Sequence, residues 1–515
     1  MQTDSRIKRI VIVGGGTAGW IAASALAKKL GRTCSIQLIE SPDIPTVGVG
    51  EATIPGIIDF IRFLGVDQED FMQHVQATIK LAIRFIDWHH LGHLYWHPFG
   101  PFGVFIDRLP FYHFWHKASA QGLDVNLRDF NLEIAMAEQN RFIFPGNPQG
   151  IAPGLRYALH FDAGLVARYL RLYSEHRGVV RLERSVAGVT QREDGSIDAV
   201  VFKEGDKLQG DLFIDCTGFR GVLIEGALQT GYVDWTHLLP NNRAVAMQVP
   251  NQIPRGPYTT ATARPAGWQW KIPLQHRVGT GYVYSSDHIS DDQALQDLLA
   301  QPGNAAPLTE PRFIRFVTGR RRNFWNRNCV ALGLGSGFIE PLESTSIHLI
   351  ISGVYALLDH FPDLSFDSVN TAHYNAQVID EFDRVRDFII LHYCTTQRTD
   401  TEYWKRCQQI QLPENLAERI DIYKRTGRIF QKRHEVFVEL SWFFVMEGMG
   451  LRPRIYDPLV DATDWEEVKR VMAAMRQKVA AEAASAPLHD SFFPEKPRED
   501  IAPAKGWKRV GATPG

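Results

Sequence analysis

The sequence contains few cysteines for its length, and their spacing is irregular. Five cysteines are scattered over 515 residues, and no two of them have CxxC spacing. This distribution indicates neither a zinc site nor a disulfide framework, so no metal site is predicted. Unpaired thiols are typical of a reducing compartment, and we expect the protein to be cytoplasmic.

The sequence also has no large excess of charge of either sign and no long apolar run. The formal net charge is −2 at pH 7, which gives no basic surface for a nucleic acid. No uninterrupted apolar run approaches the roughly 20 residues that span a bilayer, and residues 1–8 lack the apolar core of a signal peptide. We therefore expect no nucleic-acid partner and no membrane association.

A nucleotide-binding pattern lies near the start of the chain. Residues 9–13 and 35–39 predict buried strands, and residues 20–30 between them predict a helix. Gly14-Gly-Gly-Thr-Ala-Gly19 joins the first strand to the helix, and Glu40 follows these glycines by about 20 residues. In such a unit the first glycine makes a tight turn, the second admits a pyrophosphate and the third allows close helix packing. The pattern predicts an FAD or NAD site formed by Gly14, Gly16, Thr17, Ala18, Gly19 and Glu40.

A second glycine-rich stretch, residues 333–348, lies between a predicted strand at 329–332 and a predicted buried helix at 347–358. Its glycines let the backbone pass close to a flat or charged group. Pro341, Ser344 and Thr345 mark a helix start, whose unpaired amides and partial positive charge favour an anion, and Glu343 lies beside it. The alternative interpretation is an ordinary glycine-rich turn with a helix cap.

Two further segments contain candidate residues. The loop 41–56 is rich in glycine and proline, so it is either a strap over a cofactor or a surface connection. Residues 71–88 predict a helix followed by a strand, in which Lys80 has apolar neighbours on both sides. Burial would disfavour the charged form of Lys80 and make its amine chemically available. The alternative is a surface lysine whose stem covers apolar groups.

Histidines and tryptophans gather in two places. Several histidines lie among aromatic residues between positions 88 and 116, without metal-ligand spacing, and we interpret them as lining or core residues. They are His90, His93, His97, His113 and His116. In Trp268-Gln-Trp-Lys-Ile-Pro273 the alternation of Trp268, Trp270 and Ile272 predicts one shared strand face. The two indoles form either an apolar wall or an ordinary cross-strand ladder.

The remaining pattern predicts the fold class. Residues 211–219 predict a strand that closes the nucleotide-binding unit, 181–202 a hairpin, and 245–286 a β-rich region. Helices are predicted at 374–395, 414–426, 437–448 and 465–484, followed after about residue 485 by a peripheral tail. We predict an α/β fold with a Rossmann-like, two-dinucleotide FAD-binding unit, a β-rich substrate module and a helical C-terminal part. The expected domains are 1–370, with β-rich insertions at about 60–160 and 240–320, and 371–515.

These motifs together resemble the flavin-dependent halogenases of the tryptophan halogenase family. The resemblance rests on Gly14–Gly19, Val47-Gly-Val-Gly-Glu-Ala-Thr-Ile-Pro55, Lys80, Trp268-Gln-Trp-Lys-Ile-Pro273 and Phe338-Ile-Glu-Pro-Leu-Glu-Ser-Thr-Ser-Ile347. It implies the nucleotide fold of flavin monooxygenases, reduced FAD from a transiently bound flavin reductase, and chloride or bromide as a reactant. It also implies a small aromatic substrate and a possible homodimer.

The resemblance further implies roles for individual residues. A halide at the backbone amides of Thr345 and Ser346 is oxidised at the flavin, and the hypohalous acid travels through a tunnel to Lys80. Lys80 either hydrogen-bonds it or holds the halogen as a haloamine. Glu343 stabilises the cationic ring and takes up its proton, while Ser344 links the lysine to the flavin side. The tunnel and substrate wall comprise Trp268, Trp270, Ile272 and Pro273, and further cofactor contacts are Gly50, Ala52, Val186, Leu334 and Ile347.

Free tryptophan is not the expected substrate. Family members that act on it clamp the amino-acid backbone with aromatic and acidic residues, and no such clamp aligns with residues 441–450. We expect an indole or a similar electron-rich aromatic, and bromide in preference to chloride because bromide is easier to oxidise. Two alternatives remain, an aromatic hydroxylase that reduces its own flavin with NAD(P)H and a flavin-binding protein without catalysis. No second nucleotide fingerprint supports the hydroxylase, and Lys80→Ala would leave a pure binding protein unchanged.

Overall fold

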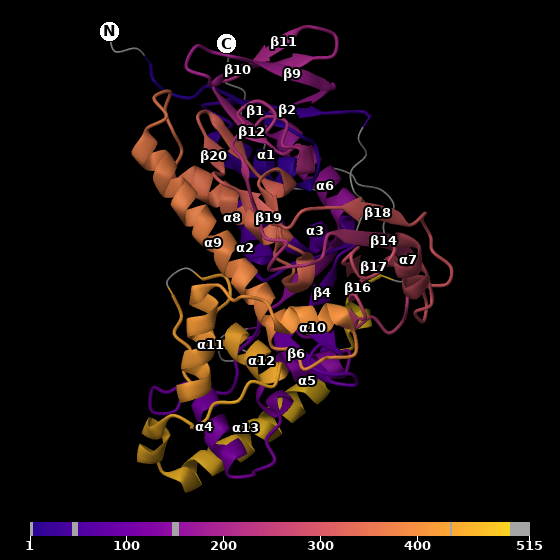
Figure 1. Ribbon diagram of the computed structural model, residues 1–515, viewed down its shortest axis with the longest axis vertical. Coiled ribbons are helices and arrows are strands. Elements are labelled where there is room, and N and C mark those ends of the chain that lie inside the picture. Colours follow the sequence, from indigo (N-terminus) through magenta and orange to yellow (C-terminus); the bar gives the residue numbers. More distant parts are fainter. Residues whose placement is uncertain (1–3, 44–49, 147–153, 433–434, 495–515) are drawn as a thin grey trace.

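The computed structural model describes residues 4–43, 50–146, 154–432 and 435–494 (Figure 1). Residues 44–49, which belong to the predicted strap, and the tail beyond residue 494 lie outside the described residues. None of the helices within the described ranges combines the length and the apolar character that crossing a bilayer requires. All five cysteines are unpaired thiols.

A six-stranded sheet carries the nucleotide-binding pattern, in the order β20-β21-β12-β1-β2-β8. Its strands are β1 (Arg9–Val13), β2 (Ser35–Glu40), β8 (Val180–Glu183), β12 (Leu212–Asp215), β20 (Trp325–Asn326) and β21 (Cys329–Ala331). β1 pairs in parallel with β2 and β12, and β12 pairs in parallel with β21. The middle of β1 is completely buried, as a parallel strand covered on both faces must be. The predicted two-dinucleotide nucleotide fold is confirmed.

Helices cover this sheet and continue away from it. α1 (Thr17–Leu30) packs against α6 (Ala163–His176) and α8 (Ser346–Asp359). The predicted hairpin at 181–202 is confirmed as β9 (Val186–Gln191) and β10 (Ile197–Phe202), to which β11 (Lys207–Gln209) adds a third strand. These three strands form the end of the molecule at the top of Figure 1.

A seven-stranded sheet confirms the predicted β-rich module, in the order β18-β14-β17-β16-β15-β5-β6. Its strands are β5 (Ala82–Ile86), β6 (Leu94–Pro98), β14 (Arg243–Pro250), β15 (Tyr258–Arg264), β16 (Gly267–Pro273), β17 (Arg277–Tyr284) and β18 (Arg312–Arg315), and α7 (Asp291–Leu299) lies against β14 and β17. β5 and β15 pair in parallel, which joins segments that are far apart in the sequence.

Smaller sheets connect the two large ones. β3 (Gly50–Ala52) and β4 (Thr78–Lys80) both pair with β7 (Ala158–Asp162), so the strand that ends in Lys80 lies between the nucleotide unit and the seven-stranded sheet. β13 (Tyr232–Asp234), β19 (Gly319–Arg321) and β22 (Gly337–Phe338) form the remaining small sheet. α2 (Gly56–Leu64) and α3 (Gln68–His74) connect β3 to β4.

The opposite end of the molecule is helical and combines early and late segments. α9 (Ser368–Cys394) runs along one side toward this end in Figure 1. The later helices are α10 (Glu402–Gln408), α11 (Glu414–Thr426), α12 (Glu439–Gly448) and α13 (Trp465–Ser485). α13 packs against α5 (Leu132–Glu138), and α4 (Phe111–Ala120) lies at the same end in Figure 1. The expectation of a β-rich insertion over 60–160 is therefore wrong for α4 and α5, which belong to the helical end.

The segment after residue 485 was expected to be a peripheral tail, and for its described part this is wrong. His489 is completely buried, accepting from the backbone N–H of Ile79 at 3.2 Å and donating to the carbonyl of Arg255 at 2.8 Å. Asp490 pairs with Arg255 at 2.6 Å. The C-terminal segment therefore fastens the strand that carries Lys80.

Candidate active site

Lys80 ends β4 and is completely buried. Its Nζ donates to Oγ of Ser344 at 2.7 Å and to the backbone carbonyl of Thr53 at 3.0 Å. The ring of Phe99 lies beside the amine, with its centroid 5.0 Å from Nζ. The alternative of a surface lysine is therefore wrong.

The surroundings of Lys80 change its protonation. Burial lowers the pKa of Lys80 to about 7, and the negative charge of Glu343 opposes this fall. Near neutral pH the amine is therefore balanced between a nucleophilic neutral form and a hydrogen-bonding ammonium. Lys80 can therefore either form a haloamine as a neutral amine or hydrogen-bond hypohalous acid as an ammonium.

Glu343 is brought to the same place through its neighbour Ser344. Its Oε2 accepts from Nδ1 of His97 at 2.8 Å, and its Oε1 lies 2.9 Å from Nε2 of His392. Burial would raise the pKa of this carboxyl, but the charge of His97 and the hydrogen bonds from His392 and His97 outweigh burial and lower the pKa to about 2. The site therefore holds an ionised carboxylate in an interior that is at most 2% exposed.

Backbone geometry explains why these groups converge. Ser344 has φ +60° and ψ +35°, a left-handed conformation between the 3₁₀ turn Pro341–Glu343 and α8. This turn directs Ser344 toward Lys80, so its hydroxyl does not cap the helix. On β6, His97 pairs with Ile83, and the N–H of Phe99 donates to the carbonyl of Leu81, which sets Phe99 beside Lys80.

The start of α8 retains the features of an anion site. The helix begins at Ser346, one residue before the predicted start, and its N-cap Thr345 makes no side-chain cap hydrogen bond. Thr345 is completely buried, and its Oγ1 has no hydrogen-bond partner among the residues that the structure describes. The amides of Thr345 and Ser346 precede the first helical hydrogen bond, which Leu349 donates to Thr345.

The two predicted tryptophans lie together on β16. The rings of Trp268 and Trp270 lie 6.1 Å apart, and Ile272 packs in a small cluster with Trp270, Ala52 and Leu274. Trp268 also donates its indole N–H to Oε2 of Glu340 at 2.7 Å. The shared face is therefore confirmed, and Pro273 ends the strand beside it.

The first glycine-rich turn fits a dinucleotide. A Cβ at Gly14, where φ is +114°, would lie 2.2 Å from the carbonyl oxygen of Cys216, and one at Gly19 would lie 1.9 Å from that of Gly14. No atom lies within 4 Å of a Cβ built on Gly16, so the backbone there faces open space at the start of α1. Glu40 pairs with Arg181 through Oε2 at 2.7 Å, which leaves its other oxygen for a ribose hydroxyl. These residues suit the pyrophosphate and ribose of FAD.

The other predicted cofactor residues lie at several places in the structure. A Cβ at Gly333 would lie 2.7 Å from Cβ of Ala18, so the second glycine-rich stretch contacts the start of α1. Leu334 in that stretch is 38% exposed, whereas Ile347 on α8 is buried. The remaining predicted contacts are placed as follows: Thr17 bonds to Ala163, Gly50 and Ala52 lie on β3 against β16 and β17, and Val186 packs beside the nucleotide sheet.

Two residues of the central cluster were not identified from the sequence. His97 was interpreted only as a lining or core residue, and His392 was not singled out within its predicted helix. The one available signal was the alternation of Tyr95, His97 and Phe99 along a strand, which places three rings on one face. Nothing in the sequence indicates which of the many histidines faces a carboxylate.

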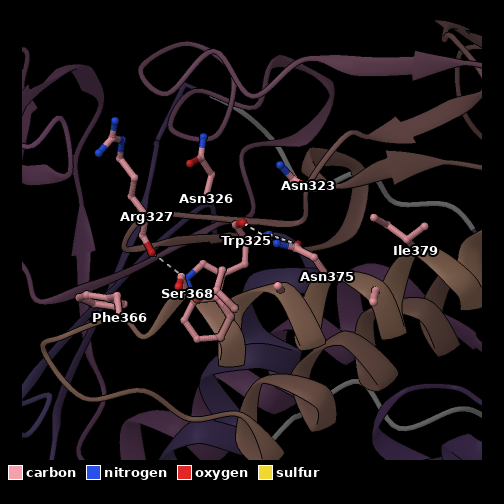
Figure 2. A pocket seen from close by; sticks show the side chains of 11 residues that line it. Asn323, Trp325, Asn326, Arg327, Phe366, Ser368, Asn375 and Ile379 are labelled. Atoms are coloured by element: carbon pink, nitrogen blue, oxygen red, sulfur yellow. Dashed lines mark hydrogen bonds between the residues drawn. The ribbon is translucent and has the colours of Figure 1, made fainter.

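A separate hollow of about 540 Å³ lies between β20 and the first turns of α9 (Figure 2). Its lining includes Trp325, Arg327 and Asn375, and the side chain of Asn375 bonds to the backbone of Trp325. None of its lining residues belongs to the cluster around Lys80.

Comparisons with known proteins agree with this architecture. The family model described as tryptophan halogenase matches residues 9–465. The tryptophan 6-halogenase SttH from Streptomyces toxytricini is 38% identical, covering 94% of this chain and 97% of SttH. Two solved structures, the flavin-dependent halogenases BrvH from Brevundimonas sp. BAL3 and Xcc4156 from Xanthomonas campestris, are each 44% identical with a TM-score of 0.91. Both alignments cover 95% of this chain, with 99% of BrvH and 98% of Xcc4156.

Proposed function

Because this chain belongs to the tryptophan halogenase family and is a flavin-dependent halogenating enzyme, we propose that it halogenates an electron-rich aromatic ring held between Lys80 and Glu343. The observation that carries this assignment is the buried amine of Lys80, joined through Ser344 to the stretch that holds an ionised Glu343. A buried amine can deliver an electrophilic halogen, and a buried carboxylate can stabilise the cationic ring that results.

The two glycine-rich stretches bind the flavin in this proposal. When bound, reduced FAD from a separate flavin reductase would reduce dioxygen to the oxidant that converts the halide to hypohalous acid. The start of α8 holds that halide through the amides of Thr345 and Ser346, and Oγ1 of Thr345, which has no partner within the described part of the chain, supports an anion there. Trp268 and Trp270 separate the flavin side from the aromatic substrate.

Lys80 then receives the hypohalous acid and aims the halogen at the ring. Ser344 keeps the amine in place, and Phe99 supplies one aromatic face beside it. The charge of Glu343 stabilises the cationic ring intermediate and favours loss of its proton. Exclusion of water from this buried cluster strengthens both electrostatic effects.

An indole without an amino-acid backbone suits the site better than free tryptophan. The acidic side chains of the helical region are already engaged, since Glu435 pairs with Arg419 at 2.5 Å and Glu447 pairs with Arg452 at 2.6 Å. Glu439 accepts from the hydroxyl of Tyr112. Each of these three carboxylates therefore already has a partner in this chain, which a substrate ammonium group would have to share or displace, although SttH carries the name of a tryptophan halogenase.

The test uses a flavin reductase, FAD, bromide and an indole panel, with mass spectrometry for the bromine isotope doublet. Lys80→Ala should lower product formation by at least about 10²-fold, because the halogen is no longer guided, while FAD binding is retained. Lys117→Ala is the matched control, because Lys117 is also buried but pairs with Asp461 in the helical end. Full activity of Lys80→Ala, or a hydroxylated product made with NAD(P)H alone, would contradict the proposal.

Halide preference is measured in the same assay. Bromide and chloride at equal concentration should give mainly brominated product, because bromide is easier to oxidise. Equal or greater chlorination would contradict this part of the proposal and leave the role of Lys80 intact.

A further inference from the structure

The parallel pairing of β5 with β15 changes just before the first paired residues of the two strands. There the N–H of Leu81 donates to the carbonyl of Pro257 at 2.7 Å. Such bonds recur at every second residue of a parallel strand, so the preceding one would join the N–H of Ile79 to the carbonyl of Arg255. In its place the imidazole of His489 lies between these two groups.

His489 bridges the two backbones with both of its ring nitrogens. Nε2 accepts from the N–H of Ile79 at 3.2 Å, and Nδ1 lies 2.8 Å from the carbonyl of Arg255. Because an N–H only donates and a carbonyl only accepts, Nε2 carries the lone pair and Nδ1 carries the proton. Burial lowers the pKa of His489 to about 4, so the ring is neutral at neutral pH. The imidazole therefore acts as a spacer that satisfies a polar group on each side.

The strand on one side of this spacer is β4, which is short and has an open edge. It comprises only Thr78–Lys80, and it lies at the edge of the three-stranded sheet β3-β7-β4. The N–H of Ile79 donates to His489 and so points away from β7, the neighbouring strand. A buried N–H at an open edge requires an acceptor. Since the strand has three residues, the bond to His489 contributes much of what fixes its direction.

Lys80 follows Ile79 directly, so the position of its amine depends on the direction of β4. Nζ of Lys80 reaches Oγ of Ser344 at 2.7 Å and the carbonyl of Thr53 at 3.0 Å. Both partners belong to other segments of the chain, and a shift of β4 would therefore change both distances. A displacement of about 1 Å at a reacting group can cost about 10²-fold in rate.

The C-terminal segment that carries His489 has its own anchors. Asp490 pairs with the guanidinium of Arg255 at 2.6 Å and accepts from its backbone N–H at 3.1 Å. The N–H of His489 donates to the carbonyl of Asn140 at 2.8 Å, and the ring of Phe493 lies 4.8 Å from the imidazole. These contacts hold the ring independently of its bond to β4. The imidazole is therefore a fixed support for the strand.

We propose that the imidazole of His489 positions Lys80 for halogen transfer by holding β4 apart from the segment 255–257. This inference rests on the proposed function and adds to it a residue from the opposite end of the chain. His489 is a positioning residue, because it acts through the backbone of Ile79 and not on the halogen or the aromatic ring.

Three variants separate the imidazole from the docking of its segment. His489→Ala removes the spacer, whereas His489→Gln keeps an amide oxygen for Ile79 and an N–H for Arg255. Asp490→Asn is the matched control, because it weakens the ion pair with Arg255 and leaves the imidazole in place. His489→Met keeps most of the volume of the ring without its two hydrogen bonds, and it replaces His489→Ala if that variant folds poorly.

The first measurement is the amount of halogenated indole formed per hypohalous acid produced, with reductase, FAD and bromide. A β-diketone traps the acid in parallel reactions. His489→Ala should lower this ratio at least about 10-fold at an unchanged rate of trapping, because the amine of Lys80 is displaced. His489→Gln and Asp490→Asn should keep the ratio of the unaltered protein. In crystal structures of the variants, only His489→Ala should lose the hydrogen bond from Lys80 to Ser344.

Other results would overturn the inference. An unchanged ratio in His489→Ala, an equal loss in Asp490→Asn, or a retained bond from Lys80 to Ser344 would each show that the imidazole does not position the amine. Loss of trapped oxidant in His489→Ala would also overturn it, because the effect would then precede halogen transfer. Absence of trapped oxidant from the unaltered protein would remove the proposed function instead, and the crystal structures would still decide whether His489 positions Lys80.

Discussion

Two buried carboxylates on either side of the Pro341–Leu342 dipeptide behave in opposite ways. Glu340 accepts from the indole of Trp268, the amide of Asn241 and the hydroxyl of Tyr393, all of them neutral groups. Burial raises the pKa of Glu340 in spite of these three hydrogen bonds. The pKa of Glu343 is instead lowered to about 2, because the charge of His97 and the hydrogen bonds from His392 and His97 outweigh burial.

The comparison teaches that the charge of the partners, more than burial, sets the charge of each carboxyl. Neutral donors offset only part of the desolvation of a buried anion, whereas a cation at hydrogen-bond distance offsets it fully. Glu343 is therefore the negative charge of the site. Glu340 instead fixes the wall residue Trp268, and its second oxygen has no hydrogen-bond partner among the described residues.

The largest expected effect separates the two carboxylates by activity. Glu343→Gln should lower turnover by about 10²–10³-fold, because it removes the charge that stabilises the cationic ring, while trapping of hypohalous acid stays normal. Glu340→Gln is the matched control and should stay within about threefold, because its amide oxygen still accepts from the same neutral donors. Equal losses in the two variants would show that the two carboxyls do not differ in function.

The next effect tests His392, whose Nε2 lies 2.9 Å from Oε1 of Glu343. His392→Phe should destabilise the fold by about 3 kcal/mol, because it leaves a buried carboxylate short of its counter-charge. Urea unfolding at pH 7 measures the change. His392→Gln keeps an N–H donor and should recover part of both stability and turnover. An unchanged unfolding midpoint for His392→Phe would argue against an ion pair with Glu343.

The third prediction concerns Lys80, whose pKa, like that of Glu340, is shifted mainly by burial. The folded pKa of about 7 lies below that of an unfolded lysine, so between pH 7 and about 10 the unfolded chain binds the additional proton. The contribution of Lys80 to stability therefore rises with pH by about 1.4 kcal/mol per unit in this window, and it is flat below pH 7. Lys80→Met should lack this rise. The prediction would be contradicted if the stability of the unaltered protein and that of Lys80→Met changed equally between pH 7 and pH 9.

The smallest expected effect concerns Glu340, whose hydrogen-bond donors are all neutral groups. Trp268→Phe removes one of three donors to Glu340 and some buried volume, which should cost about 1–3 kcal/mol. Thermal unfolding measures it, with Trp270→Phe as the control because Trp270 does not donate to Glu340. If Trp268→Phe lowered the free energy of unfolding more than His392→Phe does, neutral partners would contribute more to stability than charged ones, contrary to this expectation.

Much of the nucleotide unit could be predicted from the sequence. β1, α1 and β2 form within the first 40 residues, and the turn requires Gly14 and Gly19 because a Cβ there would meet backbone atoms. The shared face of Trp268 and Trp270 was also predictable, because side chains alternate along any strand. The helices α4 and α5 were not predicted, and only in α4 is the composition rich in aromatic residues, which are also typical of strands.

The histidine partners of Glu343 could not be predicted in the same way. The pairing of β6 with β5 and the rotation of α9 about its axis direct His97 and His392 toward Glu343, which lies far from both in the sequence. The buried position of His489 against Ile79 likewise depends on a fold contact between opposite ends of the chain. Composition and spacing give no information on such contacts.

The sequence by itself determined the nucleotide fold and the approximate place of the helix start at residue 346, because these follow from local backbone sterics, while the family resemblance singled out Lys80 and Glu343. Only the tertiary structure decided that Lys80 is buried, that Glu343 is ionised and that Glu340 remains hard to ionise. The physical reason is that protonation depends on solvent exclusion and on charges a few ångströms away, and the chain supplies those charges from segments that are distant in the sequence.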